Sequence, residues 1–424
     1  MVSVIITVIF IAGYAAISLE NYLQVNKTAT ALLLGVACWL VYMLSNSTDQ
    51  YTALHQLSEH LSDISEILFF LLGAMTIVEL IDTHKGFRIV TDLITTTSKI
   101  KLLWIISIIT FILSTILNNL TTAIVMISVL RSIVDDKKER MIMSSMVVIA
   151  SNSGGVWSPI GDVTTTMLWI GGQVTTLNII RQLFLPAVFS LLIPVVCQSF
   201  FIKGTFKRPD PDPDLPHAEP YSGLVFYLGI GVLISVPAFT SITHLPPYIG
   251  MLFGLGVLWA VTEIVHAGRE QRKHLRVSNM ISKIDHATIL FFLGILLAVA
   301  SLESMGILTS IADWMDKVIG NKTVIVTTLG LLSSVIDNVP LVAATMGMYP
   351  LTHFPTDDRL WELIAYCTGT GGSLLIIGSA AGVVAMGMEN IGFFWYLKRI
   401  SLTALFGYFA GIVVYLLMLM LERN

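Results

Sequence analysis

Residues 151–166 read SNSGGVWSPIGDVTTT and interrupt a segment that is otherwise apolar and long enough to cross a membrane. The stretch holds three glycines, a proline and the carboxylate of Asp162. In hydrocarbon, backbone N–H and C=O groups must be paired within the protein, so such a break is tolerated only where it faces protein or a water-filled cavity. An acid at this depth costs about 3 kcal/mol on insertion scales and is by default a functional candidate. The stretch therefore predicts a broken membrane helix that carries a site.

The composition agrees with a membrane protein. The chain has 424 residues, of which 55% are hydrophobic and 12% are charged, and its mean hydropathy is +0.81. These values exclude a soluble globular protein. Apolar runs of about 18–25 residues recur along the chain, each long enough for a helical crossing. The fold class predicted is an all-α polytopic membrane protein with about 10 spans plus two re-entrant hairpins.

The cysteines and the first apolar stretch are interpreted as structural features without a role in a site. The three cysteines lie in apolar runs without metal-ligand spacing, so we interpret Cys38, Cys197 and Cys367 as small buried residues. The first apolar stretch, 2–19, lacks a basic start and a cleavage site, and it is interpreted as a retained span. No cofactor and no nucleic-acid partner is expected.

Basic residues in the loops orient the chain, because Lys and Arg accumulate on the cytoplasmic side of a membrane. Both flanks of the broken run 102–133 are basic, which favours a hairpin entering from the cytoplasm. The run 323–350 is predicted to enter from outside, and both termini are predicted outside the cell. The loop 47–64 is expected outside, and the proline-rich segment 203–220 is expected as a cytoplasmic linker. Unbroken spans are expected near 2–20, 29–46, 65–82, 181–202, 222–240, 248–266, 286–303 and 400–421, and broken helices at 141–170 and 360–388.

Features of the first half (1–202) return in the same order in the second half (221–424). Asn119 matches Asn338, and the pair Gly154-Gly155 matches Gly371-Gly372. The basic loops give the two halves opposite orientations in the membrane, which is typical of an inverted-topology repeat. In such transporters the substrate site lies near the membrane midplane, at the corresponding broken segments.

The four broken segments are rich in oxygen-bearing side chains, which suit a dehydrated Na⁺ ion. Asp162 and Asp337 are predicted to be the carboxylates at this depth. Burial disfavours the charged form of a carboxyl group and a bound cation favours it, so H⁺ and Na⁺ can compete for one acid. The other candidates contributed by these segments are Asn118, Asn119, Thr121, Thr122, Ser151, Asn152, Ser153, Asn338, Thr368, Thr370 and Ser373.

The alternative interpretation is that these residues cap half-helices. Asp162 would cap a helix starting at Val163, and Asp337 would cap one with Pro340 in its first turn. Acids near span ends are interpreted as interfacial: Glu79, Asp82, Glu303 and Glu389. His84, His244 and His286 lie at helix ends or in loops, where position alone does not separate pH sensing from a solvated histidine.

The motifs resemble those of the NhaD-type sodium/proton antiporters, in the ion transporter (arsenite/citrate permease-like) superfamily. The resemblance rests on LNNLTTA at 117–123, on 151–166 with its GDVTTT ending, and on IDNVP at 336–340. It implies exchange of cytoplasmic Na⁺ or Li⁺ for external H⁺ across the plasma (inner) membrane, with bilayer lipid around the protein. The family positions matched are Asn152, Asp162, Thr164, Thr165, Ser333 and Asn338. Such scaffolds often form homodimers, although no segment here identifies an interface.

Other functions on this scaffold stay open at this point. A sodium-coupled dicarboxylate importer would want basic groups at the midplane, and the sequence places none there; an arsenite exporter and a channel are further options. An intramembrane aspartyl protease also uses two acids, but residues 159–162 lack the first glycine of a Gly-x-Gly-Asp motif. A serine protease is weak, because Ser153 has no membrane histidine as a partner.

Overall fold

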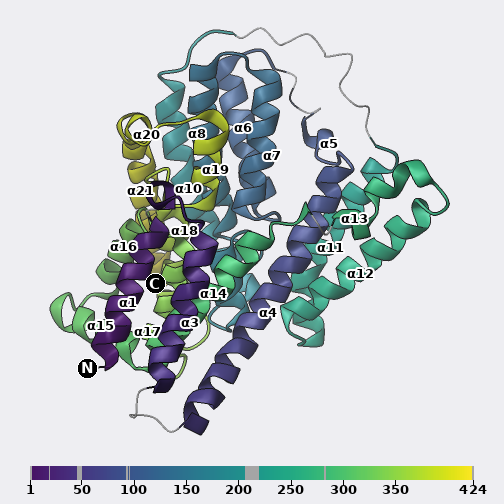
Figure 1. Cartoon of the computed structure of the whole chain (residues 1–424). Coiled ribbons are helices and arrows are strands. Elements are labelled where there is room, and N and C mark those ends of the chain that lie inside the picture. The colour runs from purple at the N-terminus through teal and green to yellow at the C-terminus, as the bar shows by residue number, and fades with distance from the viewer. Residues whose placement is uncertain are drawn as a thin grey trace.

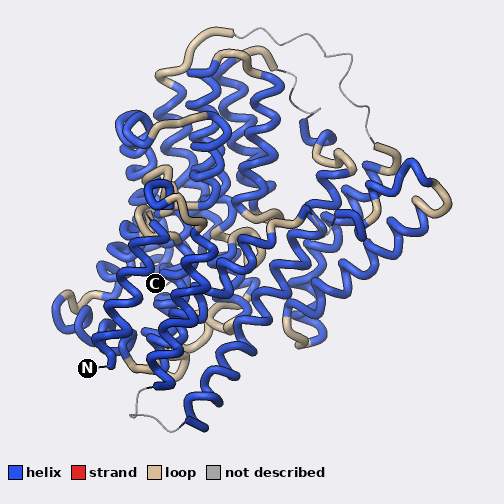
Figure 2. The backbone as a smooth tube through the Cα atoms, viewed as in Figure 1, coloured by secondary structure: helices blue, strands red, loops and turns tan. Residues whose placement is uncertain are grey.

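A computed structural model describes residues 2–18, 20–44, 50–91, 94, 96–205, 219–280 and 283–422. In these ranges the regular structure is helical, apart from one isolated bridge between Ser98 and Thr205 (Figure 2). Seven of the described helices are long and apolar enough to cross a membrane. The shorter apolar helix α1 and two interrupted helices add to these. The prediction of an all-α polytopic membrane protein is confirmed.

One group of helices consists of long, unbroken rods (Figure 1). In this group α3 packs along α14, α11 along α12, and α4 against α11, α12 and α14. The rods are α1 (Val2–Ser18), α3 (Lys27–Leu44), α4 (Gln50–Thr83), α11 (Ser222–Thr243), α12 (Pro247–Val265) and α14 (His286–Ser304). Short helices connect them: α2 (Glu20–Leu23), α5 (Arg88–Thr91), η1 (Glu270–Leu275), α13 (Val277–Met280) and α15 (Ile307–Val318).

The second group contains the broken helices and the hairpins. From the first half it takes α6 (Lys99–Ser114), α7 (Asn119–Ile133), α8 (Lys137–Gly155), α9 (Val163–Ile170) and α10 (Thr176–Ser199). From the second half it takes α16 (Lys322–Leu332), α17 (Asn338–Met348), α18 (Arg359–Gly371), α19 (Ala380–Glu389), α20 (Phe393–Arg399) and α21 (Ser401–Leu421). The halves interlock, because α10 packs on α21 and α19 packs on both α7 and α8.

Ion pairs join the two halves at the end of this group where α7 stops and α8 starts. Glu389, only 1% exposed at the end of α19, accepts a hydrogen bond of 2.7 Å from Nε of Arg140. Nε of Arg131 lies 3.4 Å from the same carboxylate. A buried carboxylate is tolerated only when it is paired in this way. Glu389, which the sequence predicts at the membrane interface, is therefore buried and links α19 to α7 and α8.

The structure differs from the sequence prediction on two connections. The predicted loop 47–64 is wrong from Gln50 on, because α4 starts there and runs for 34 residues. A helix need not end where its polar residues begin, since water solvates its outer turns and the pair His55–Glu59 supports them. The connector after α14 forms the amphipathic helix α15, which buries Leu308, Ala312 and Met315. Residues 45–49 and 206–218, which include most of the predicted linker, lie outside the described residues.

Candidate functional site

The hairpin turns and the helix breaks meet in the middle of the second group. The α6–α7 hairpin turns just before Asn119, and the α16–α17 hairpin turns just before Asn338. The interrupted helices restart at Val163 and at Ala380. All four of these residues line one cavity of about 40 Å³, together with Asp162. Side chains from α4 and α14 close the cavity on the side of the long rods.

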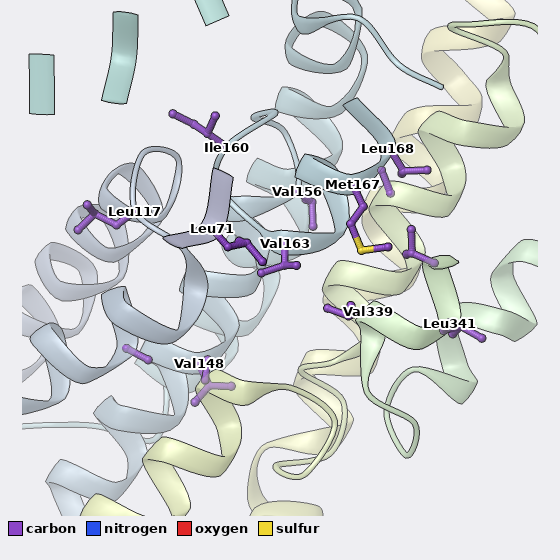
Figure 3. Close-up of a cluster of buried hydrophobic side chains, with 14 of the residues drawn as sticks. Leu71, Leu117, Val148, Val156, Ile160, Val163, Met167, Leu168, Val339 and Leu341 are labelled. Carbon is purple, nitrogen blue, oxygen red and sulfur yellow. The ribbon is translucent and has the colours of Figure 1, made fainter. Parts of the chain in front are cut away.

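The cavity is small, and both polar and apolar side chains line it. Leu71 of α4, Val163 of α9 and Val339 of α17 belong to one buried cluster (Figure 3). The N-termini of α7, α9, α17 and α19 border the cavity, and helix N-termini carry partial positive charge. Because of this partial positive charge, the cavity favours a negative charge. It can hold a cation only if carboxylates line it as well.

Asp162 supplies such a carboxylate. The residue is 1% exposed and stands directly before α9 with extended backbone angles, φ −139° and ψ 149°. Its side chain makes no capping hydrogen bond of normal geometry to α9, but it still interacts with the backbone of Val163 and Thr164 and with the Thr164 hydroxyl. From the other half, Nδ2 of Asn338 donates a hydrogen bond of 3.2 Å to its Oδ2. The carboxylate oxygens are also the atoms that a proton or a cation would bind.

Three threonines follow Asp162 and differ in what their hydroxyls do. The hydroxyls of Thr165 and Thr166 each donate to the backbone carbonyl of Asp162 at 2.9 Å. The buried Oγ1 of Thr164 forms no hydrogen bond of normal geometry with a described residue, and the group that it interacts with is the carboxyl group of Asp162. Thr164 is therefore the threonine whose hydroxyl lies at the acid itself.

Asp337 behaves differently from Asp162. It is partly exposed, and its carboxylate accepts a hydrogen bond of 3.3 Å from the backbone N–H of Val339. The capping interpretation therefore describes Asp337. The residue nevertheless lines the same cavity as Asp162, so it adds negative charge there.

A chain of amides and hydroxyls occupies the other side of the site. Nδ2 of Asn119 donates to Oδ1 of Asn152 at 3.0 Å. Nδ2 of Asn152 then donates to the hydroxyls of Ser373 and Ser379, at 2.9 Å in each case. These contacts connect the first hairpin, the first broken helix and the second broken helix.

Most of the remaining predicted residues make hydrogen bonds away from the cavity. Hydroxyls at the breaks donate to backbone carbonyls: Ser151 to Val148, Ser333 to Thr368, Thr368 to Ile364 and Thr370 to Tyr366. Ser153 accepts from the hydroxyl of Ser190 at 2.7 Å. Asn118 lines the cavity but caps α7 by accepting from the N–H of Thr121. The buried hydroxyl of Thr122 makes no hydrogen bond within the described residues.

Ser379 directly precedes α19, and in the sequence it stands at the position of the second half that matches Asp162. Lys27 was not singled out from the sequence. It is half-buried at the start of α3 and lines the cavity, with its side chain 4.8 Å from the ring of Phe291. The prediction from the sequence concerned buried Lys or Arg at the midplane, whereas Lys27 reaches the cavity from a span end through the packing of α3 on α14.

Comparison with known proteins agrees with this geometry. The sequence pattern of the CitMHS citrate transporter family matches residues 8–363. The chain is 50% identical to sodium/proton antiporter 1 of Arabidopsis thaliana, over 97% of this chain and 72% of that protein. It is 47% identical to sodium/proton antiporter 2 of the same plant, over 96% of this chain and 98% of that protein. With the Na⁺/H⁺ antiporter NhaD of Vibrio cholerae it shares 30% identity over 97% of this chain and 90% of that protein.

This chain belongs to the NhaD-type sodium/proton antiporters, within the CitMHS family. The resemblance seen in the motifs is confirmed, and the protein is an ion transporter and not an enzyme. The names of these relatives describe antiport of Na⁺ and H⁺.

Proposed function

We propose that this protein exchanges Na⁺ or Li⁺ for H⁺ by alternating access, with Asp162 as the group that binds either ion. The observation that supports this most directly is the environment of Asp162. Its carboxylate is 1% exposed, borders a cavity of about 40 Å³ and accepts one hydrogen bond from Asn338. A volume of this size holds about one water-sized particle, which suits a dehydrated ion and excludes a dicarboxylate.

Burial of Asp162 explains why the two ions exchange. A bare carboxylate away from water is costly unless it is neutralised by a partner. A proton and a sodium ion both neutralise it, and one excludes the other. The conformational change that moves the site between the two sides of the membrane then proceeds when either ion is bound. It is hindered when no ion is bound. Thr164 and Asn338 supply oxygen ligands, and Asp337 adds charge at the entrance.

The proposed orientation follows the basic residues. Lys85, Arg88, Arg131 and Arg140 lie at one end of the helices, which we assign to the cytoplasm. Both termini are then outside the cell, and the protein expels cytoplasmic Na⁺ through the plasma membrane. Bilayer lipid surrounds the long rods, whose outer faces are apolar, as at Leu33, Val36 and Leu40 of α3.

Transport in everted vesicles tests the proposal. Vesicles from cells that lack other Na⁺/H⁺ antiporters are loaded with a pH gradient, and Na⁺, Li⁺ or K⁺ is added. Na⁺ and Li⁺ are expected to dissipate the gradient for the wild type, and Asp162→Asn is expected to abolish the response. Thr166→Val is the matched control, because it alters the same turn without altering the carboxylate. Unchanged exchange by Asp162→Asn, or Na⁺-dependent succinate uptake without loss of the pH gradient, would contradict the proposal.

A further inference from the structure

A second cavity lies close to the cavity at Asp162, which is called the site cavity from here on. The second cavity has a volume of about 260 Å³ and lies among α4, α9, α14 and α17. Its lining includes the carboxylates of Asp63, Glu66 and Glu303, and Asp63 and Glu303 are exposed. This outer cavity therefore opens to water beside the polar outer turns of α4.

Four helices line both cavities. Each helix contributes one apolar residue to the site cavity and another, four positions away, to the outer cavity. These pairs are Leu71 and Ile67 in α4, Val163 and Met167 in α9, Phe292 and Leu296 in α14, and Val339 and Ala343 in α17. Four residues rise about 6 Å along a helix, which is about one turn. The two cavities are therefore one turn apart on all four helices.

The four helices form a closed ring. The long rod α4 packs against α9 and α14, and α17 packs against the same two helices. The eight paired residues are each at most 9% exposed. Four of them, Leu71, Val163, Met167 and Val339, belong to the apolar cluster of Figure 3. These eight side chains make up an apolar layer that closes the centre of the ring between the two cavities.

One face of α14 runs past both cavities. Thr288 and Phe292 line the site cavity, and Leu296, Ala300 and Glu303 line the outer cavity. Spacings of three and four residues keep all five on one side of the helix. This stripe has polar residues at its two ends and apolar residues in the middle, so it connects the buried site to water through a single apolar layer.

The two cavities differ in how much water a cation can keep. A water molecule takes up about 30 Å³ in the liquid, so the outer cavity has room for about eight and the site cavity for about one. A cation can thus enter the outer cavity with much of its hydration shell and must lose most of it at the apolar layer. The acids at the mouth raise the local concentration of cations.

We infer that cations pass between Asp162 and the outside of the cell through the centre of this ring, and that the apolar layer is the gate on that side. The inference rests on the proposed function, because it takes Asp162 as the ion-binding acid and the end with Glu303 as external. The closed layer excludes an ion, since apolar side chains do not replace its water. Two helices of the ring are long rods and two belong to the group with the breaks, so a shift of one group against the other opens the layer.

Thiol labelling tests the passage. Single cysteines are introduced at Ala300 or at Ala298 of the full-length protein, after Cys38, Cys197 and Cys367 have been replaced by alanine. Both positions are buried on α14, but only Ala300 lines the outer cavity. A charged, membrane-impermeant methanethiosulfonate added outside intact cells is expected to label Ala300→Cys at least tenfold faster than Ala298→Cys. The attached group is expected to lower exchange at least tenfold in vesicles made from the labelled cells.

A cysteine behind the layer tests the gate. Val339→Cys lines the site cavity, so external labelling is expected to be at least tenfold slower than for Ala300→Cys. Adding Leu296→Ala thins the layer and is expected to speed the labelling of Val339→Cys at least tenfold. Leu297→Ala is the matched control, because Leu297 lines neither cavity.

Equal labelling of Ala300→Cys and Ala298→Cys would overturn the passage, and so would labelling of Ala300→Cys from the cytoplasmic side alone. Equal effects of Leu296→Ala and Leu297→Ala would overturn the gate. If Leu296→Ala does not fold, the rates for Val339→Cys and Ala300→Cys decide, and equal rates would overturn the gate. Failure of the proposed function is a separate result, since the labelling pattern would then stay while Asp162→Asn still exchanged Na⁺.

Discussion

Asn338 donates from Nδ2 to Oδ2 of Asp162 over 3.2 Å, although 176 positions separate the two residues in the chain. The contact joins the second hairpin to the first broken helix. Thr164, in the same half as Asp162, also interacts with this carboxyl group, so the acid that we assign to ion binding is positioned by residues of both halves. An ion at Asp162 is therefore sensed by both halves at once.

Asn338→Ala removes this contact. A hydrogen bond to a charged group contributes about 1.5–3 kcal/mol, so the Na⁺ concentration for half-maximal exchange is expected to rise about tenfold or more. Dissipation of a pH gradient in everted vesicles measures it. Asn321→Ala is the control, because Asn321 caps α16 at the surface. Equal responses of the two variants would show that the cross-half contact is not used in binding.

Thr164→Val and Thr166→Val are expected to have opposite effects. The first removes a buried hydroxyl that interacts with the carboxyl group of Asp162, so Na⁺ affinity is expected to fall about tenfold while thermal stability in Na⁺-free buffer changes little. The second removes the one hydroxyl that donates to the carbonyls of Pro159 and Asp162, so thermal stability is expected to fall while affinity changes little. Melting temperatures and ²²Na⁺ binding on the same samples separate the two effects. The reverse pattern would contradict the role of Thr164.

Gly154→Ala is expected to prevent folding. The new methyl group would lie 2.2 Å from the carbonyl oxygen of Phe111, and backbone of α6 cannot move away without opening the hairpin. Gly387→Ala is the matched control, because no atom lies within 4 Å of the added Cβ in α19. Yield of monodisperse protein from detergent gel filtration measures both. Normal yield of Gly154→Ala would show that α6 and α8 are less closely packed.

The pair His84 and His266 is expected to make stability depend on pH. Both residues are fully buried just after α4 and α12, with their Nε2 atoms 3.1 Å apart. Burial lowers the pKa of His84, and burial and then His84 lower the pKa of His266 to about 4. The other groups that act on the pair are Glu219 and His274 for His84, and Arg272, Arg276 and Arg269 for His266.

Because these pKa values are lowered on folding, the unfolded chain binds more protons than the folded protein below about pH 6.5. The free energy of unfolding is therefore complete above that pH and declines toward pH 4, by up to about 1.4 kcal/mol per pH unit for each histidine. His84→Gln/His266→Gln is expected to flatten the dependence of melting temperature on pH between 7 and 5. His55→Gln, at an exposed position, is the control. If the melting temperature of the wild type did not change between pH 7 and pH 5, the role assigned to His84 and His266 would be contradicted.

Much of the site was predictable because the signals are local. An acid, glycines and a proline inside an apolar run predict a break at 151–166 wherever the helix packs. The match between Asn119 and Asn338 is also a sequence pattern. The individual roles were not predictable, since Asp162 and Asp337 have similar local patterns. Only the packing shows that Asp337 is partly exposed at the start of α17, while Asp162 is buried and in contact with Asn338 of the other half.

The sequence by itself determined that this chain is a polytopic helical membrane protein, and it predicted two matching halves with the candidate site at their polar breaks. Hydropathy and motif spacing suffice for these, because each depends on residues close together in the chain. Tertiary structure decided which oxygens meet. The contacts Asn338–Asp162 and Asn152–Ser379 cross between the halves, and residues so far apart in the chain meet only once the helices have packed.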